Sequence, residues 1–141
     1  MDFLVDPWSQ DLLDWGPVPV RIVLGVIFVD AGFGKWHRGI SGTGDWFAGL
    51  GIPFPQAQAR LVASLELVGG ALLILGLFTH WVAIPLAANM LVATYIAKVK
   101  LRLPFQGGEV QGYELNVILL AAAGTLAVGG AGTLSLDELL A

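Results

Sequence analysis

A single carboxylate inside a long apolar segment is the feature that most constrains this fold. Glu66 lies in the run from Ala57 to Phe78, whose only other charged residue is Arg60, and Gly69 and Gly70 follow it closely. A run of this length can cross a bilayer, which takes about 20 residues at a rise of about 1.5 Å each. Glu66 would then lie roughly 10 Å inside the apolar core. Because an ionisable group is costly there, we expect it to face a partner, a cavity or a ligand, and not lipid.

The composition of the whole chain also indicates a membrane protein. Hydrophobic residues make up 56% of the 141 residues and charged residues 13%, whereas soluble domains have about 25% charged residues. The net charge of −4 argues against nucleic acid as a partner. Cysteine is absent, which excludes thiol redox chemistry, thiolate-bound iron–sulfur clusters and covalently attached c-type haem. Residues 1–16 hold four aspartates and no basic residue, so we expect no signal peptide there. Aromatic and apolar residues recur between the aspartates at roughly helical spacing, which predicts an interfacial segment; the alternative is a disordered tail.

Four apolar segments predict an all-α fold, a membrane-embedded antiparallel four-helix bundle that forms a single domain over residues 1–141. The spans are expected at about 17–36, 57–78, 82–99 and 112–128, followed by a C-terminal tail at 129–141. Thr79-His80-Trp81 is expected to be a short turn, which makes the second and third spans antiparallel neighbours. Within the long connection after the first span, residues 45–50 are expected to form a short helical turn on the membrane surface.

The first span has a face suited to close helix packing. Its residues recur at steps of four, three, four and three, and therefore share one side of a helix: Arg21, Gly25, Phe28, Gly32 and Lys35. The two glycines allow another helix to approach closely. Asp30 is expected beside this face. In the third span, Asn89 is expected to donate an interhelical hydrogen bond.

Folding the four spans back on one another gathers the charged residues at the end of the bundle that holds the two long connections. Six basic residues belong to that end: Lys35, Arg38, Arg60, Lys98, Lys100 and Arg102. Only Arg21 belongs to the other end. The positive-inside rule therefore predicts cytoplasmic connections and extracytoplasmic termini in the plasma membrane of a prokaryote.

This gathering of charge predicts a polar site near the cytoplasmic face. The candidate proton carriers are Glu66, Glu114 and Asp30. The candidate lining of a polar pocket at this end is Glu66, Tyr113, Lys35 and Arg60. Ionisable residues inside a membrane protein indicate function. The alternative is a structural cluster, in which Lys35 and Arg60 neutralise the carboxylates and fix the helix register.

A metal site is not expected. His37 and His80 fall on opposite sides of the membrane, and the carboxylates lack the companion histidines of a di-iron bundle. The two histidines are therefore interpreted as interfacial residues.

Four motifs, in this order, resemble the DoxX family of membrane proteins. They are Arg21-x-x-Leu24-Gly25-x-x-Phe28 with Gly32-x-x-Lys35, then Glu66-x-x-Gly69-Gly70-x-Leu72-Leu73-x-Leu75-Gly76-Leu77, then Gly112-Tyr113-Glu114, and finally Gly132-Thr133-Leu134-Ser135-Leu136-Asp137. The likeness covers residues 20–137. The chain departs from the family at His80, where a basic residue is common, and at residues 130–133, where the family often has Gly-Pro-Gly-Arg.

The resemblance implies a four-helix membrane bundle with a link to redox chemistry, because the family takes its name from the membrane subunit of a thiosulfate:quinone oxidoreductase. Three hypotheses follow: a quinone-facing subunit of an oxidoreductase complex, a non-catalytic scaffold or anchor subunit, and a small transporter. The last is disfavoured because the chain has no internal repeat. Whether the chain is itself an enzyme stays open. The expected partners are the lipid bilayer and either other redox subunits or further copies of the chain, and quinone is the one cofactor implied.

Overall fold

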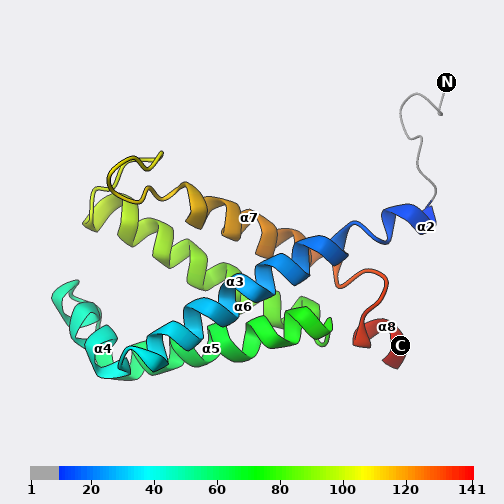
Figure 1. Ribbon diagram of the computed structural model, residues 1–141, viewed down its shortest axis with the longest axis horizontal. Coiled ribbons are helices and arrows are strands. Elements are labelled where there is room, and N and C mark those ends of the chain that lie inside the picture. Colours follow the sequence, from blue (N-terminus) through cyan, green and yellow to red (C-terminus); the bar gives the residue numbers. More distant parts are fainter. Residues whose placement is uncertain (1–9) are drawn as a thin grey trace.

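The computed structural model describes residues 10–141, and in this part of the chain helices are the only regular secondary structure, with no β-strand (Figure 1). The all-α prediction is therefore confirmed for the described residues. Most of the predicted interfacial segment at 1–16 lies outside them, and its last part contains the short helix α2 (Gln10–Leu13).

Four longer helices form the body of the molecule: α3 (Pro17–His37), α5 (Pro55–Leu75), α6 (Thr79–Tyr95) and α7 (Glu114–Gly129). Three further helical segments complete the described chain: α4 (Ile40–Gly49), the π-helix η1 (Ile96–Lys100), which extends α6, and α8 (Leu136–Leu140). By length and composition, α3, α5 and α6 with its extension could each cross a membrane. Helix α7 is apolar but has only 16 residues.

The body consists of two helix pairs, α3 with α5 and α6 with α7, and the contacts between the pairs are less extensive. The pairs lie close together near the C-terminus and diverge toward α4 (Figure 1). Buried side chains from all four helices fill the space where the pairs meet: Leu24, Phe28, Leu73, Leu86 and Leu126. The divergence leaves room between the pairs at the other end.

Glycines bring α3 and α5 into backbone contact, as the sequence predicts. A Cβ atom added at Gly25 would lie 2.6 Å from the carbonyl oxygen of Gly70, and one at Gly32 would lie 2.5 Å from the amide nitrogen of Leu67. Neither distance is tolerated by a real side chain. On the predicted face of α3, Arg21, Gly25, Phe28 and Gly32 are buried and Lys35 is partly buried, so the face itself is confirmed.

The turn between α5 and α6 differs from the prediction. Helix α5 ends at Leu75, where Gly76 adopts a left-handed conformation with φ 65°. Helix α6 then begins at Thr79, so the predicted turn of residues 79–81 is the first turn of α6 instead. The Asp137 carboxylate accepts hydrogen bonds from the backbone N–H groups of Phe78 (2.6 Å) and Thr79 (2.9 Å). A cap that comes from 58 residues away is not visible in the local sequence.

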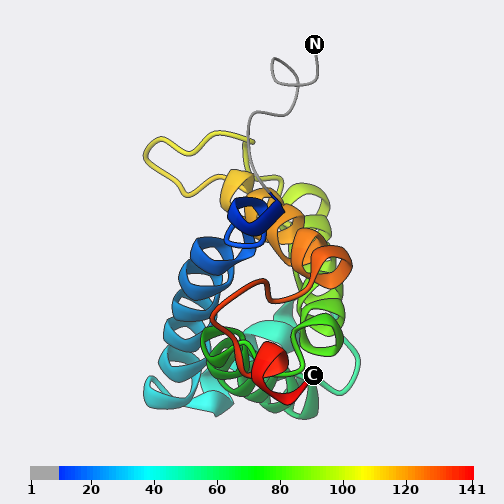
Figure 2. The same cartoon turned by 90° about the vertical axis from the view of Figure 1, so that its right-hand side faces the viewer.

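The side chain of Arg21 is buried beside this turn and is 1% exposed. Its guanidinium donates hydrogen bonds to five backbone carbonyl oxygens, two from α5 and three from the C-terminal tail: Leu73, Ile74, Ala131, Thr133 and Leu134. Figure 2 shows the tail crossing the space enclosed by the helices at this end. We call this the closed end, defined by Arg21, Asp137 and residues 130–135.

Helix α4 covers part of the opposite end. It is a helix of ten residues, longer than the predicted turn at 45–50, and it packs against α5. Phe47 is its buried anchor. The side-chain amide of Gln56 donates to Asp45 across a distance of 3.0 Å, which ties α4 to the start of α5.

Candidate functional site

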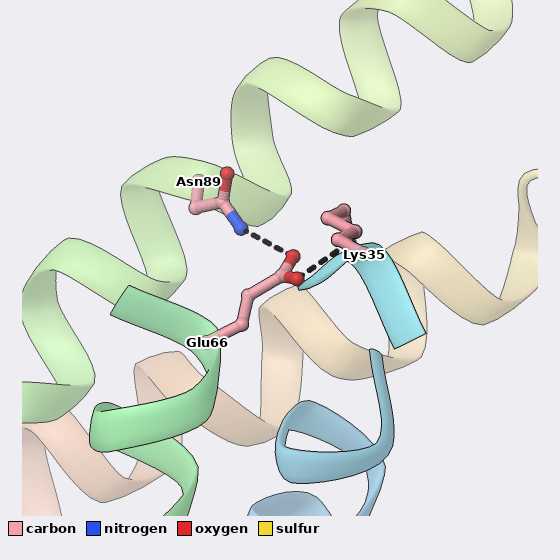
Figure 3. A network of polar contacts seen from close by, with 3 residues as sticks. All are labelled: Lys35, Glu66 and Asn89. Atoms are coloured by element: carbon pink, nitrogen blue, oxygen red, sulfur yellow. Dashed lines mark hydrogen bonds and ion pairs between the residues drawn. The ribbon is translucent and has the colours of Figure 1, made fainter. Parts of the chain in front are cut away.

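Glu66 is the centre of a polar network that joins three helices (Figure 3). It lies in the middle of α5 and is 4% exposed. Its Oε2 atom forms an ion pair with Lys35 Nζ of α3 at 2.5 Å. Its Oε1 atom accepts a hydrogen bond from Asn89 Nδ2 of α6 at 3.1 Å. The predicted interhelical bond of Asn89 is therefore present, and its acceptor is the buried carboxylate.

Close packing of the helices explains why these three side chains meet. Because Gly32 has no side chain, α3 rests directly on α5 at Ala63 and Leu67, on either side of Glu66. Lys35 is one helical turn beyond Gly32, so its side chain reaches the carboxylate. On the other side of α5, Leu86 of α6 packs over Gly69, where an added Cβ would lie 3.3 Å from it. Asn89 follows Leu86 by one turn.

A cavity of about 640 Å³ opens beside the network, between the diverging helix pairs. The volume falls within the range of about 300–1,000 Å³ that is usual for small-molecule sites. Most of the wall is apolar and comes from α3 to α7, η1 and the connection before α7. The polar side chains in the wall are Lys35, Glu66, Asn89, Gln58, Gln111 and Asn116. We call this the open end, defined by the cavity and the Lys35–Glu66–Asn89 network.

Two amides in the cavity wall were not predicted as site residues. Gln58 and Asn116 line the cavity, and neither side chain forms a hydrogen bond with any residue that the structure describes. Gln58 is two helical turns before Glu66 on the same face of α5, with Val62 between them at steps of four. This spacing is visible in the sequence and could have identified Gln58 as a residue of the same site as Glu66. Asn116 is a lone amide near the start of the apolar helix α7.

Two predicted site residues lie away from the cavity. Asp30 and Arg60 are both exposed, and neither is part of the cavity wall. Asp30 follows the buried Phe28 by two residues, which places it about 200° further round α3. Arg60 precedes Glu66 by six residues, about 240° round α5 from it. The predicted neutralisation by Arg60 is therefore wrong, because Lys35–Glu66 is the one ion pair among the described residues.

The other two predicted residues hold the connection before α7. The Tyr113 ring packs edge-on against Phe105, with 5.3 Å between the ring centroids. A carboxylate oxygen of Glu114 accepts a hydrogen bond from the Gly107 amide at 3.2 Å. Neither residue is part of the cavity wall, although their neighbours Gly112 and Leu115 are. Among the described residues, no three His, Asp or Glu side chains are grouped as metal ligands.

Comparisons with known proteins agree with the helical, apolar structure. The family model for DoxX matches residues 16–99, a range that includes Lys35, Glu66 and Asn89. The chain is 34% identical over 122 residues to a Bacillus subtilis (strain 168) protein named "Putative oxidoreductase CatD", covering 86% of this chain and 84% of the relative. It is 28% identical over 131 residues to "Inner membrane protein YqjF" of Escherichia coli (strain K12), covering 93% and 96%. It is 31% identical over 124 residues to "Inner membrane protein YphA" of the same strain, covering 84% and 85%. No solved structure matches the chain.

Proposed function

The chain belongs to the DoxX family of membrane proteins, and on that premise we propose that it is an inner-membrane subunit linked to redox chemistry, which binds a quinone in the cavity beside Glu66. The observation that carries the proposal is the cavity itself, an apolar space of about 640 Å³ with a buried ion pair in its wall. When bound, a quinone supplies two-electron chemistry coupled to the uptake or release of two protons. The name of one relative, an oxidoreductase, supports the redox link.

The residues of the cavity fit such a ligand. The oxygens of a quinone accept hydrogen bonds, and the wall offers donors in Lys35, Asn89, Gln58 and Asn116. The last two amides have no protein partner among the described residues, so they are free to bind a ligand. Apolar side chains suit a ring and its tail. Small-molecule sites of this kind combine apolar walls with a few placed polar groups.

Within this proposal, Glu66 carries protons and Lys35 positions it. Glu66 is buried in the cavity wall, where a carboxylate can accept or release a proton. Lys35 holds the Oε2 atom, and its own side chain remains 23% exposed. The network therefore connects the buried carboxylate with the partly exposed end of α3, which is a route for protons toward water.

We further propose that α7 completes a four-helix antiparallel membrane bundle. Its 16 residues span about 24 Å, somewhat less than the hydrocarbon core of about 30 Å. Its outer face is apolar, with Ile118 and Val128 exposed. The orientation follows from charge. Arg21 is bound to backbone carbonyls inside the protein and Lys35 is paired with Glu66, so neither acts as a loop charge. The other five basic residues, all at the connection end, point to a cytoplasmic location for it.

A photoreactive short-chain quinone tests the proposed ligand. The full chain in lipid nanodiscs is irradiated with the probe, and the labelled peptides are identified by mass spectrometry. We expect labelling of cavity residues such as Met90 and Leu119, which unlabelled quinone prevents.

A matched pair of variants makes this test specific. Ala93→Phe fills the cavity and should abolish labelling, because Ala93 lines the wall. Ala121→Phe adds the same ring to the exposed side of α7 and should leave labelling intact. Label that spreads over lipid-facing residues, resists competition and is the same in both variants would sink the proposal.

An anchoring role is the second candidate, and one observation favours it. Both carboxylate oxygens of Glu66 are already bound within the protein, as they would be in a purely structural tie between three helices. In that case Glu66→Gln lowers the amount of folded protein and its assembly with redox subunits or further copies. The fraction of Glu66→Gln protein that still folds would then have the same quinone affinity as wild type. If the chain binds no quinone at all, wild type and variant would both fail to bind it.

A further inference from the structure

A second, smaller hollow lies where α3 meets α4, beside the cavity mouth. Its volume is about 370 Å³, and its walls are Lys35, Arg38, Gly39, Gly42, Thr43 and Trp46. We call it the basic groove. Lys35 and Trp46 belong to the walls of both the groove and the cavity, so the two spaces are neighbours that share these side chains.

The chemistry of the basic groove is suited to an anion. Two of its side chains are cationic and one is a hydroxyl, and no carboxylate is part of its wall. Arg38 forms no ion pair with any described residue. The nearest acidic residue of α4, Asp45, is bound to Gln56 instead. The groove therefore has positive charge that the described part of the protein does not neutralise.

The basic groove also has room for a ligand. A Cβ atom added at Gly39 or at Gly42 would meet nothing within 4 Å. The backbone between α3 and α4 is thus accessible to a group larger than a methyl. Gly39 has φ 104°, a conformation that favours glycine, so this stretch of the wall stays without a side chain.

We propose that the basic groove binds the phosphate of an anionic ligand, in the first place a membrane lipid headgroup. Arg38 supplies a planar fork of donors that matches phosphate oxygens, and Lys35 supplies a point charge. Trp46 is 53% exposed at the rim, and tryptophan prefers the membrane–water boundary. Basic pockets between membrane helices on the cytoplasmic side bind anionic headgroups. The observations that support this site do not rest on the proposed binding of quinone in the cavity.

The shared lysine couples the two spaces. Lys35 Nζ is bound to Glu66 at 2.5 Å, and Lys35 is also part of the wall of the basic groove. A phosphate in the groove competes with Glu66 for the same ammonium group. Phosphate bound in the groove therefore weakens the ion pair between Lys35 and Glu66. Because coupling between two sites is reciprocal, a ligand that displaces Lys35 from Glu66 strengthens phosphate binding.

Native mass spectrometry of the delipidated full chain tests this site, with phosphatidylglycerol as the probe and phosphatidylcholine as the neutral comparison. We expect retention of phosphatidylglycerol over phosphatidylcholine. Arg38→Gln should weaken phosphatidylglycerol binding about fivefold, the change that results from the loss of one basic contact of about 1 kcal/mol. Arg60→Gln is the matched control, because Arg60 is an exposed arginine of the same end outside the groove.

A second pair of variants tests the groove by filling it. Gly42→Leu should reduce phosphatidylglycerol binding, whereas Gly49→Leu, at an open position of the same helix, should not. Millimolar inorganic phosphate is added in a separate arm. Displacement of the lipid by phosphate means that the groove takes free phosphate as well, and the absence of displacement assigns it to lipid. Equal retention of both lipids, or equal loss in Arg38→Gln and Arg60→Gln, would overturn the proposal.

Discussion

The two ends of this molecule each bury one charged side chain, but they hold it in different ways. At the closed end, five backbone carbonyls surround the Arg21 guanidinium, and these come from α5 and the C-terminal tail. At the open end, two side chains from two other helices hold the Glu66 carboxylate. The first set of partners is fixed by the backbone, and the second can be rearranged by rotation of side chains.

This difference separates a structural charge from a candidate functional one. Arg21 is part of the wall of neither the cavity nor the basic groove, and its hydrogen-bond acceptors are backbone carbonyls of the fold. Glu66 forms part of the wall of a cavity of about 640 Å³. The same wall contains the side-chain amides of Gln58 and Asn116, which have no hydrogen-bond partner among the described residues. Both charges are costly in an apolar interior. At the open end this cost is accompanied by space for a ligand, so we propose that this end binds a ligand and that the closed end serves stability.

The largest effect is expected at the closed end. Arg21→Met removes five hydrogen bonds and leaves buried carbonyls without donors, which should lower the free energy of unfolding by at least about 3 kcal/mol. Thermal unfolding of the purified protein in detergent measures this. If the free energy of unfolding of the variant is within about 1 kcal/mol of the wild-type value, the hydrogen bonds of Arg21 do not stabilise the closed end as we describe.

The next largest effect is expected at the contact between Gly25 of α3 and Gly70 of α5. Gly25→Ala forces α3 away from the Gly70 carbonyl, because the added Cβ would lie 2.6 Å from that oxygen. Overpacking of this kind costs about 1–3 kcal/mol. Gly124→Ala is the control, since an added Cβ there meets nothing within 4 Å. Equal stability of the two variants in a chemical unfolding series would refute the close packing.

A smaller effect is expected from the cap at the closed end. Asp137→Ala leaves the backbone N–H groups of Phe78 and Thr79 without their acceptor. Loss of a helix cap costs about 1 kcal/mol. Quinone affinity should not change, because the cap is remote from the cavity wall. A variant with wild-type stability but weaker quinone binding would show that the two ends are not independent.

The smallest effect on stability is expected at the open end. Asn116→Leu replaces an amide that has no described partner, so the unfolding free energy should change by no more than about 0.5 kcal/mol. Quinone affinity should fall about fivefold, since one hydrogen bond is worth about 1 kcal/mol. Isothermal titration in nanodiscs measures the affinity. An unchanged affinity would remove Asn116 from the site.

The sequence predicted the helical class, the glycine face of α3 and the burial of Glu66, because each follows from local periodicity in an apolar segment. It also predicted Asn89 as an interhelical donor. Asp30 was expected beside the glycine face of α3, but it lies about 200° round from Phe28 and is exposed. Arg60 was grouped with Glu66 because both belong to the same end of α5, without regard to rotation about the helix axis. Both residues lie on other faces of α3 and α5 than the residues of the network.

Contacts between distant segments were beyond sequence reasoning. The Arg21 interactions with residues 131–134 bridge more than 100 positions, and Asp137 caps a helix 58 residues earlier. The cavity itself depends on how far the two helix pairs diverge. No local sequence pattern predicts that divergence. The spacing of Gln58, Val62 and Glu66 at steps of four does indicate the part of the cavity wall that α5 forms.

The most direct test of the central claim is the quinone affinity of Glu66→Gln, measured in nanodiscs beside its unfolding free energy. We predict about a tenfold loss of affinity, equivalent to about 1.4 kcal/mol. We also predict a smaller loss of stability than in Arg21→Met, because the released Lys35 is partly exposed and can reach water. A Glu66→Gln protein that binds quinone as wild type does, and is as unstable as Arg21→Met, would contradict the assignment of function to the open end.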